Sequence, residues 1–217
     1  MKLMYKLFFK RFLDIVLSGI SLIVLAPVML VVALLIRLKL GSPVIYAVPR
    51  PGRNSRIFTL YKFRSMNNTR DNSGQLLPDN MRLTCFGQFL RSTSVDELPE
   101  LFNILKGDMS IVGPRPLAVQ YLTFYSEAER HRHDVRPGLT GLAQIRSRNE
   151  LNWESKFAND IEYVNNITFI SDIKIIFKTI LKVFRREDIG IRGISSAEDF
   201  DKYRKRQIEN RMEGQKL

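Results

Sequence analysis

Two adjacent carboxylates, Asp96 and Glu97 in the stretch STSVDELP, are the residues best suited to carry chemistry in this chain. Carboxylates can transfer protons, or hold a hard cation such as Mg²⁺ through their oxygen atoms. The pair lies in a basic chain of 217 residues, with 34 Lys and Arg residues against 22 Asp and Glu residues. Two acids side by side among so many cations therefore require an explanation.

The same stretch also fits a structural interpretation. Ser94 and Glu97 have the S-x-x-E spacing of a capping box, in which each side chain binds a backbone N–H group at a helix start. Pro99 argues against this box, because its ring would clash with an upstream carbonyl inside the first turns of that helix. A helix that begins at Pro99 leaves Asp96 and Glu97 in the turn ahead of it, where backbone N–H groups favour negative charge. The segment alone leaves both interpretations open.

The net charge of +12 is concentrated near the N-terminus. Residues 1–66 hold eleven basic residues and a single acid, Asp14. This excess indicates a partner with fixed negative charge, such as anionic lipid, nucleic acid or a phosphorylated substrate. The single cysteine, Cys85, excludes an internal disulfide framework and suits a reducing compartment. We expect Cys85 to behave as a small buried hydrophobic residue.

An apolar stretch, IVLSGISLIVLAPVMLVVALLI, covers Ile15 to Ile36 without a charge over 22 residues. A helix needs about 20 such residues to cross a bilayer. Basic residues flank the stretch on both sides, and a spanning helix would leave one basic cluster on the wrong side of the membrane. Ala26 and Pro27 lie near its middle, where a proline kinks a helix. We therefore expect a re-entrant hairpin that enters and leaves on the cytoplasmic face, with a bitopic helix that tolerates its proline as the alternative.

A second membrane-active segment is predicted near the C-terminus. The stretch SDIKIIFKTILKVFRRED predicts a helix with Ser171 as its N-cap, apolar residues on one face and lysines at spacing four on another. This pattern is typical of a helix that lies on an anionic membrane surface. A core helix with a solvated basic face has the same pattern, so both interpretations stay open.

The remaining chain predicts a small β element and several further helices. Two β-rich runs, Val44 to Val48 and Ile57 to Phe63, flank the turn signal Pro51-Gly52. The segment NNTRDNSGQLLPDN is polar and is expected to form a surface loop. The predicted helices cover residues 99–106, 117–131, 153–165 and 171–186. The fold class is therefore mixed α/β and mainly helical, with room for one core and one appendage.

Arginine recurs beside Gly or Pro, or at the ends of elements. The planar guanidinium fork suits phosphate oxygens, and proline-fixed turns would hold it in place. A solvated surface charge is the alternative for any one of these residues. They are Arg64, Arg91, Arg115, Arg136, Arg146 and Arg148.

The chain resembles the monotopic phosphoglycosyl transferases, a group of bacterial sugar transferases, over nearly its whole length. The matching segments are KRFLDI, the apolar stretch with Pro27, RPG with IFTLYKFRSM, RLTCFGQFLRSTSVDELPELFNILKGDMSIVGPRPL, VRPGLTGLAQI, RNELNWESKF and DIKIIFKTILKV. The block from DELPEL to PRPL is highly specific. The compact form is most similar to the small transferases that begin bacterial N-linked glycoprotein assembly, whose preferred donors are UDP-linked diacetamido sugars such as UDP-N,N′-diacetylbacillosamine.

The resemblance implies the reaction and the main residues. A sugar 1-phosphate moves from a UDP-sugar to undecaprenyl phosphate, and UMP is released. Asp96 matches the family's nucleophile, which would carry the phosphosugar between two displacements. Glu97 is the expected Mg²⁺ ligand, with Asp96 as a further candidate, because Mg²⁺ prefers carboxylate and phosphate oxygen. Mg²⁺ and arginines would neutralise the accumulated phosphate charge.

Further family positions are basic. Arg115, between Pro114 and Pro116, matches a Pro-Arg-Pro motif expected to contact the uridine end of the donor or its phosphates. Lys2, Lys6 and Lys10 are expected to bind lipid headgroups, each adding about 1 kcal/mol near an anionic surface. The expected phosphate-binding residues are Lys62, Arg64, Arg91, Arg136 and Arg148.

The resemblance also implies a domain plan and a location. Residues 1–40 form the membrane anchor, 41–190 the catalytic domain on the cytoplasmic face of the inner membrane, and 191–217 a polar, mobile tail. The partners are the UDP-sugar, undecaprenyl phosphate and anionic lipids, without nucleic acid; a homodimer or a complex with pathway glycosyltransferases stays open. Leu142 replaces a Trp that is usual in the family, so no contact of that indole is carried over. A catalytically silent scaffold, or a basic module that binds lipid or nucleic acid, is the alternative.

Overall fold

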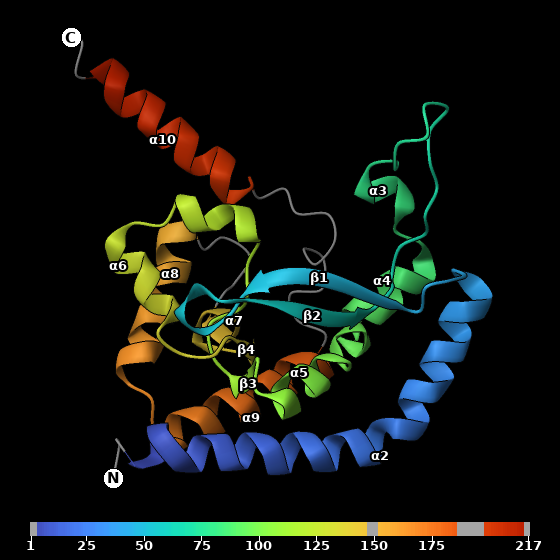
Figure 1. Ribbon diagram of the computed structural model, residues 1–217, viewed down its shortest axis with the longest axis horizontal. Helices are drawn as coiled ribbons and strands as arrows, with labels where there is room; N and C mark the ends of the chain where they lie inside the picture. The colour runs from blue at the N-terminus through green and yellow to red at the C-terminus, as the bar shows by residue number, and fades with distance from the viewer. Residues whose placement is uncertain (1–3, 147–151, 186–197, 215–217) are drawn as a thin grey trace.

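The computed structural model describes residues 4–146, 152–185 and 198–214. It confirms a mixed α/β fold that is mainly helical (Figure 1). Short π-helical or 3₁₀ turns are labelled η. The elements are η1 (Tyr5–Phe9), α2 (Lys10–Lys39), β1 (Ile45–Pro51), η2 (Arg53–Ser55), β2 (Ile57–Phe63), α3 (Asp79–Arg82), α4 (Cys85–Ser92), η3 (Val95–Glu97), α5 (Glu100–Lys106), β3 (Ser110–Val112), η4 (Val119–Thr123), α6 (Glu127–Arg130), η5 (His131–His133), β4 (Gly138–Thr140), α7 (Leu142–Arg146), α8 (Trp153–Asn165), α9 (Phe169–Arg185) and α10 (Phe200–Gly214).

The apolar stretch forms one continuous helix of 30 residues, α2, with Pro27 inside it. Figure 1 shows that α2 runs along the base of the molecule and then bends upward towards α4. We attribute the bend to Pro27, because proline removes a backbone hydrogen bond and its ring clashes with the preceding turn. Ala26 and Pro27 are both exposed. The C-terminal part of α2 packs through Val32 and Ile36 into one core cluster of the domain.

Strands β1 and β2 form an antiparallel hairpin in which Ile45 pairs with Phe63 and Pro51 pairs with Ile57. The prediction for β2 is confirmed at both ends, and β1 extends three residues beyond the predicted run. Helix α5 is attached to the outer edge of β2 through the fully buried Asn103. Its side-chain amide accepts from the backbone N–H of Tyr61 at 3.0 Å and donates to the carbonyl of Thr59 at 2.7 Å. These bonds fix the position of α5 relative to β2.

Strands β3 and β4 form a short parallel pair beneath the hairpin. The backbones approach so closely beyond β3 that a Cβ atom on Gly138 would lie 2.1 Å from the nitrogen of Gly113. Glycine at this position is therefore required for the pairing. The turn that follows β3 is tied back by a bond of 2.9 Å from the N–H of Gly138 to the carbonyl of Pro114.

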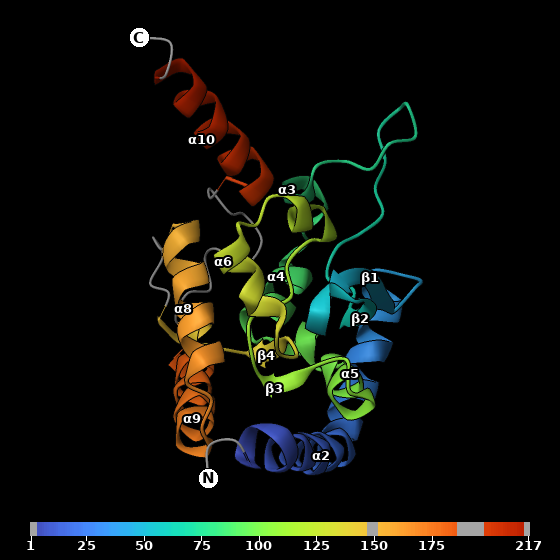
Figure 2. The same cartoon turned by 60° about the vertical axis from the view of Figure 1, so that its left-hand side comes forward.

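Helices α8 and α9 form one side of the molecule, and α9 lies close to the start of α2 (Figure 2). The predicted bounds of α8 are confirmed. Helix α9 starts at Phe169, before the predicted N-cap Ser171, because Thr168 and Ser171 exchange side-chain to backbone hydrogen bonds of 3.0 and 3.1 Å. Ile175 on α9 is buried in the core. An apolar stripe on α9 is exposed: Phe169, Ile170, Ile173, Phe177 and Ile180.

Three further predictions are corrected. The predicted helix over residues 117–131 is divided into η4 and α6, because Ser126 begins a new helix with its own capping box. The predicted mobile tail contains helix α10, whose Phe200 is fully buried; residues 186–197 and 215–217 lie outside the described residues. Cys85 is exposed, since it lies at the start of α4, on the side away from the core.

Candidate active site

The Asp96-Glu97 dyad lies in η3, between helices α4 and α5. Ser94 adopts the left-handed conformation with φ of 55° and forms no cap with its side chain, so the capping box is wrong. Helix α5 begins at Glu100 with Pro99 in the N-cap position, which confirms the alternative. Proline ends the preceding turn here and prepares the backbone for the helix.

The carboxylates of the dyad and of Glu100 are buried together. Their residues are 8%, 6% and 2% exposed, respectively. Burial raises the pKa of Asp96, and the charge of Glu97 raises it further. Burial, followed by the charge of Glu97, raises the pKa of Glu100 to about 7. The site therefore concentrates negative charge that is only stable next to cations.

Two cations hold this group of acids. Lys62 on β2 places its Nζ 2.9 Å from Oε1 of Glu97 and 2.9 Å from Oε1 of Glu100. Arg115 donates from Nη2 to the same Oε1 of Glu97 at 2.7 Å, and the charge of Glu97 raises the pKa of Arg115. Within the described part of the chain, the Asp96 carboxylate forms no hydrogen bond or ion pair. The two members of the dyad thus differ sharply in their surroundings.

Arg115 lies in the turn between Pro114 and Pro116, which is supported from behind. Arg132 on η5 donates from Nη2 to the carbonyl oxygen of Arg115 at 2.7 Å. The same guanidinium binds Oδ2 of Asp160 on α8 through Nη2 at 2.8 Å and Nε at 3.0 Å. Arg132 and Asp160 are 3% and 4% exposed, so this is a buried ion pair. It fixes the backbone that carries Arg115.

Two more arginines belong to the site, Arg91 beside Asp96 and Arg50 near Arg115 and Glu100. Arg91 on α4 donates from Nε to the hydroxyl of Ser65 at 2.9 Å, and its charge lowers the pKa of Asp96. Helix α4 reaches Ser65 because Gly87 permits close contact; a Cβ there would lie 1.8 Å from the Ser65 carbonyl oxygen. Burial and the charge of Arg115 lower the pKa of Arg50 on β1, although Tyr46 opposes them. The three cations whose charges act on Asp96 are Lys62, Arg115 and Arg91, and cations grouped in this way suit the phosphate oxygens of a diphosphate.

The other predicted phosphate-binding residues are placed elsewhere or are not described. Arg64 donates to the backbone carbonyls of Leu40, Ser42 and Met66, and so holds the chain segment after α2 against the end of β2. Arg136 donates to the carbonyl of Gly107, at the end of α5 opposite the dyad. Arg148 lies outside the described residues.

Sequence reasoning missed three residues of this site: Glu100, Arg132 and Arg50. Glu100 had a signal, since it lies three residues after Glu97 at the start of the predicted helix, where both can face the same cation. Arg132 gave no signal, because its partners are 17 and 28 residues away in the chain. Arg50 had a weak signal as the arginine of the RPG motif.

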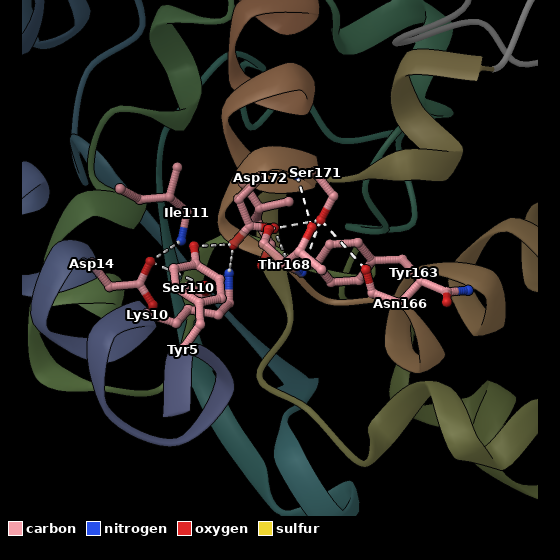
Figure 3. Close-up of polar contacts among 11 residues, drawn as sticks. Tyr5, Lys10, Asp14, Ser110, Ile111, Tyr163, Asn166, Thr168, Ser171 and Asp172 are labelled. Atoms are coloured by element: carbon pink, nitrogen blue, oxygen red, sulfur yellow. Dashed lines mark hydrogen bonds and ion pairs between the residues drawn. The ribbon is translucent and has the colours of Figure 1, made fainter. Parts of the chain in front are cut away.

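A second polar centre lies away from the dyad, where the N-terminal segment meets α9 (Figure 3). Asp172 accepts from the hydroxyl of Tyr5 and from Lys10 Nζ, both at 2.7 Å, and from the hydroxyl of Tyr163 at 2.8 Å. Asp14 accepts from the backbone N–H of Ile111 at 3.0 Å and from Ser110. Lys10 is only 12% exposed, so it is held in this centre. Lys6 is exposed, and Lys2 lies outside the described residues.

The arrangement at the dyad can support covalent transfer of a phosphorylated group. Asp96, which forms no hydrogen bond or ion pair among the described residues, lies beside Glu97, which Lys62 and Arg115 hold, and the charges of Arg91 and Arg115 act on Asp96. A cavity of about 10 Å³ behind the turn, lined by Arg115, Arg132 and His133, has room for about one water molecule. A substrate would therefore bind on the open side of the dyad.

Comparison with known proteins identifies a family for this chain. Residues 5–186 match the family described as bacterial sugar transferase. The uncharacterized sugar transferase EpsL of Bacillus subtilis is 47% identical over 191 residues, which cover 88% of this chain and 95% of EpsL.

Two relatives have names that state an activity. The undecaprenyl-phosphate galactose phosphotransferase of Salmonella typhimurium is 39% identical over 197 residues, covering 83% of this chain and 41% of that protein. The UDP-glucose:undecaprenyl-phosphate glucose-1-phosphate transferase of Klebsiella pneumoniae is 40% identical over 186 residues, covering 81% of this chain and 40% of that protein. The chain thus spans less than half the length of these two relatives. With its dyad, its Pro-Arg-Pro turn and these matches, the chain belongs to the bacterial sugar transferase family.

Proposed function

We propose that this protein transfers a sugar 1-phosphate from a UDP-sugar to undecaprenyl phosphate. The names of the Salmonella and Klebsiella relatives give undecaprenyl phosphate as the acceptor of a sugar phosphate. The observation that carries the proposal is the contrast within the dyad. Glu97 is held by Lys62 and Arg115, whereas the Asp96 carboxylate forms no hydrogen bond or ion pair among the described residues and is available to react.

The reaction proceeds in two displacements at one phosphorus atom. In the first, a carboxylate oxygen of Asp96 bonds to the sugar-bearing phosphorus of the donor, the bond from that phosphorus to the bridging oxygen breaks, and UMP leaves. In the second, a phosphate oxygen of undecaprenyl phosphate attacks the same phosphorus and the bond to Asp96 breaks. A water-soluble donor and a membrane-bound acceptor can thereby use the same site in turn.

The surrounding cations supply electrostatic stabilisation. Arg115 and Arg91 lie beside Asp96, where negative charge accumulates when UMP leaves. Lys62 pairs with both Glu97 and Glu100 and offsets the repulsion between their negative charges, so it preserves the shape of the site. The donor set fits Mg²⁺, which proteins commonly bind through one or two carboxylates together with substrate phosphates. Asp96 and Glu97 would hold the ion, and it would neutralise the phosphate oxygens of the donor.

We propose further that α2 enters and leaves the membrane on the cytoplasmic face. Both of its ends are attached to the same domain. At the start of the helix, Arg11 donates to the carbonyls of Ile104 and Leu105 at 2.6 and 2.8 Å, and Lys10 binds Asp172. At its end, Leu40 packs against the domain and Arg64 binds its carbonyl. Attachment of both ends to one domain supports an arrangement in which both ends lie on the same side of the bilayer, whose hydrocarbon core is about 30 Å thick.

The exposed apolar surface supports the same placement. Phe8 and Phe9 of η1 and Phe12 at the start of α2 are exposed, and α9 exposes its own apolar stripe next to lysines. Aliphatic and aromatic residues with flanking lysines are typical of helices that lie in the membrane interface. The protein would therefore bind anionic lipid through these two helices and face the cytoplasm with its dyad.

The pathway that we propose is the first membrane step of glycoconjugate assembly. Two more relatives, from Sinorhizobium fredii and Rhizobium leguminosarum, are named exopolysaccharide production proteins. A lipid-linked sugar diphosphate is the product expected of this reaction, and further glycosyltransferases would extend it.

The test is an intact mass spectrum of the detergent-purified protein with Mg²⁺ and a panel of UDP-sugars, without acceptor. We expect a phosphosugar-sized mass increment with released UMP for the wild type and none for Asp96→Asn. Asp108→Asn, which changes an acid at the opposite end of α5, should still form the adduct. If no donor gives an adduct or UMP, and undecaprenyl phosphate does not restore turnover, the protein is a scaffold or a binding module.

A further inference from the structure

Helix α10 inserts one fully buried aromatic residue, Phe200, into the catalytic domain. Phe200 is 0% exposed and lies outside residues 5–186, which match the family. Its ring is stacked on Tyr125 with centroids 5.3 Å apart and contacts Phe157 edge-on at 4.9 Å. Trp153 and Tyr121 complete this aromatic nest, with centroids 5.3 and 5.5 Å from Phe200. Such pairs add to the free energy gained from burial alone.

Polar contacts around Phe200 specify how α10 docks. The indole N–H of Trp153 donates to the carbonyl of Glu198 at 3.0 Å. The hydroxyl of Tyr203 donates to Glu154 at 2.6 Å, and Arg204 pairs with Glu129 at 2.5 Å. These bonds connect the first turns of α10 to both α6 and α8, while the rest of the helix projects away from the body (Figure 1).

The aromatic nest also contacts the buried arginine that supports the active-site turn. The guanidinium of Arg132 lies over the rings of Tyr125 and Phe157, 5.6 Å from each centroid. Its Nη1 donates to the hydroxyl of Tyr125 at 3.3 Å. Two of the rings that Phe200 contacts, Tyr125 and Phe157, are therefore also the rings that contact Arg132.

The contacts continue from Arg132 to the dyad. Arg132 binds the carbonyl of Arg115, and the guanidinium of Arg115 binds Glu97. Every step in this series is a direct contact between buried or partly buried groups, and closely packed interiors transmit displacement rather than absorb it. A shift of about 1 Å at a reacting group can change a rate by up to about a hundredfold.

We propose that Phe200 is a positioning residue for the transferase reaction, which acts through the aromatic nest and Arg132 to hold Arg115 against Glu97. The inference rests on the proposed function, and it extends that function to a segment beyond the region that matches the family. The C-terminal helix thus completes the active site from behind and contributes no group to the reaction itself.

The kinetic test compares substitutions of full-length protein in detergent with a UDP-sugar and undecaprenyl phosphate. Phe200→Ala empties the nest, and we expect kcat/KM for the UDP-sugar to fall about tenfold, within the range that small misplacements cause. Phe200→Leu retains most of the apolar volume and should lose less than Phe200→Ala. Ile208→Ala is the matched control, because Ile208 lies on the same helix and is 44% exposed; it should retain wild-type kinetics.

A double-mutant cycle then tests whether the effect passes through Arg132. Arg132→Lys keeps the charge but loses the planar fork that binds Asp160 and the Arg115 carbonyl. If both residues act on the same contact, the loss in the double variant stays close to that of the worse single variant. Losses that multiply would overturn the proposal. Should Phe200→Ala fail to fold, Phe200→Leu replaces it in the cycle.

Trp153 gives a second readout that does not need activity. It is the only tryptophan in the sequence and it lies in the nest, so its emission reports whether α10 is docked. We expect a red shift for Phe200→Ala and none for Ile208→Ala. A Phe200→Ala protein with shifted emission and wild-type kcat/KM would overturn the proposal. A wild type without turnover would instead refute the proposed function. In that case the coupling between Phe200→Ala and Arg132→Lys would be measured from the unfolding midpoints of the single and double variants.

Discussion

At the scale of single residues, neighbouring side chains of the same type receive different roles from their surroundings. Asp96 and Glu97 are adjacent and both buried, yet two cations hold Glu97 and none is hydrogen-bonded to Asp96 among the described residues. A carboxylate that is held by cations keeps its charge and its position, whereas one without partners is available for a new bond. The division of roles within the dyad therefore follows from the placement of Lys62 and Arg115.

Lys62 gives the first prediction at this scale. Its Nζ separates Glu97 and Glu100, whose side chains are 8% and 3% exposed. Lys62→Met leaves two buried carboxylates without their common partner, which should lower the free energy of unfolding by about 3 kcal/mol. Chemical unfolding in detergent measures this. Lys106→Met, which removes an exposed lysine paired with Asp108, is the control and should change it little. Equal losses for both variants would contradict the expectation.

His133 gives a prediction about pH. Burial, and then the charge of Arg132, lower its pKa from 6.5 to about 4. Between pH 6.5 and pH 4 the unfolded chain therefore binds a proton that the folded protein does not. The stability contributed by neutral His133 is complete above this window and falls as the pH is lowered through it, by about 3 kcal/mol in total.

His133→Gln should remove this loss, so that the unfolding free energy of the variant depends less on pH than that of the wild type. The measurement is chemical unfolding at several pH values across the window. His131→Gln is the matched control, because that ring is 62% exposed and gains nothing from burial. A His133→Gln protein with the wild-type slope would show that His133 does not cause it.

At the scale of elements, local sequence determines the bounds of some helices and strands, whereas the way elements pack depends on contacts with residues far away in the chain. The bounds of β2 and α8 could be predicted, because alternation, an N-cap asparagine and helical spacing are local signals. The predicted helix over residues 117–131 is divided because the capping box of Ser126 begins α6. Before that point, Tyr121 of η4 packs in an aromatic cluster with Phe157 of α8 and Phe200 of α10, and helical spacing does not predict these distant contacts. The same holds for Phe200, whose four ring partners in the aromatic nest, Tyr121, Tyr125, Trp153 and Phe157, lie at least 43 residues away in the chain.

The attachment of α2 to α9 gives a prediction at this scale. Lys10 and Asp172 are 12% and 5% exposed, and their pairing joins the two membrane-facing helices. Asp172→Asn leaves a buried ammonium group without its counter-charge, so we expect a loss of about 3 kcal/mol in unfolding free energy. Lys10→Met should cost a similar amount, and the double variant less than the sum of both. Lys6→Met, at an exposed position nearby, is the control; strictly additive losses would show that the pair does not join the helices.

At the scale of the whole molecule, charge and apolar surface together define how the protein would lie on a membrane. The hydropathy of α2 alone permits a spanning helix, and in the sequence only the basic residues on both sides of the helix argue against spanning. The structure adds that the two ends of α2 are attached to the same domain through Arg11 and Arg64. That information depends on contacts between residues 93 and 24 positions apart, which no local pattern contains.

The topology of α2 can be measured with single cysteines. In a Cys85→Ser background, which removes the exposed native thiol, Lys6→Cys and Arg53→Cys place one exposed thiol before α2 and one after it. If α2 re-enters, a membrane-impermeant maleimide should label both positions in inside-out vesicles and neither in intact spheroplasts. A spanning helix would place the two positions on opposite sides, so each preparation would label one of them. Pro27→Leu should straighten α2 and shift part of the population towards this second pattern, because the bend depends on the hydrogen bond that proline lacks.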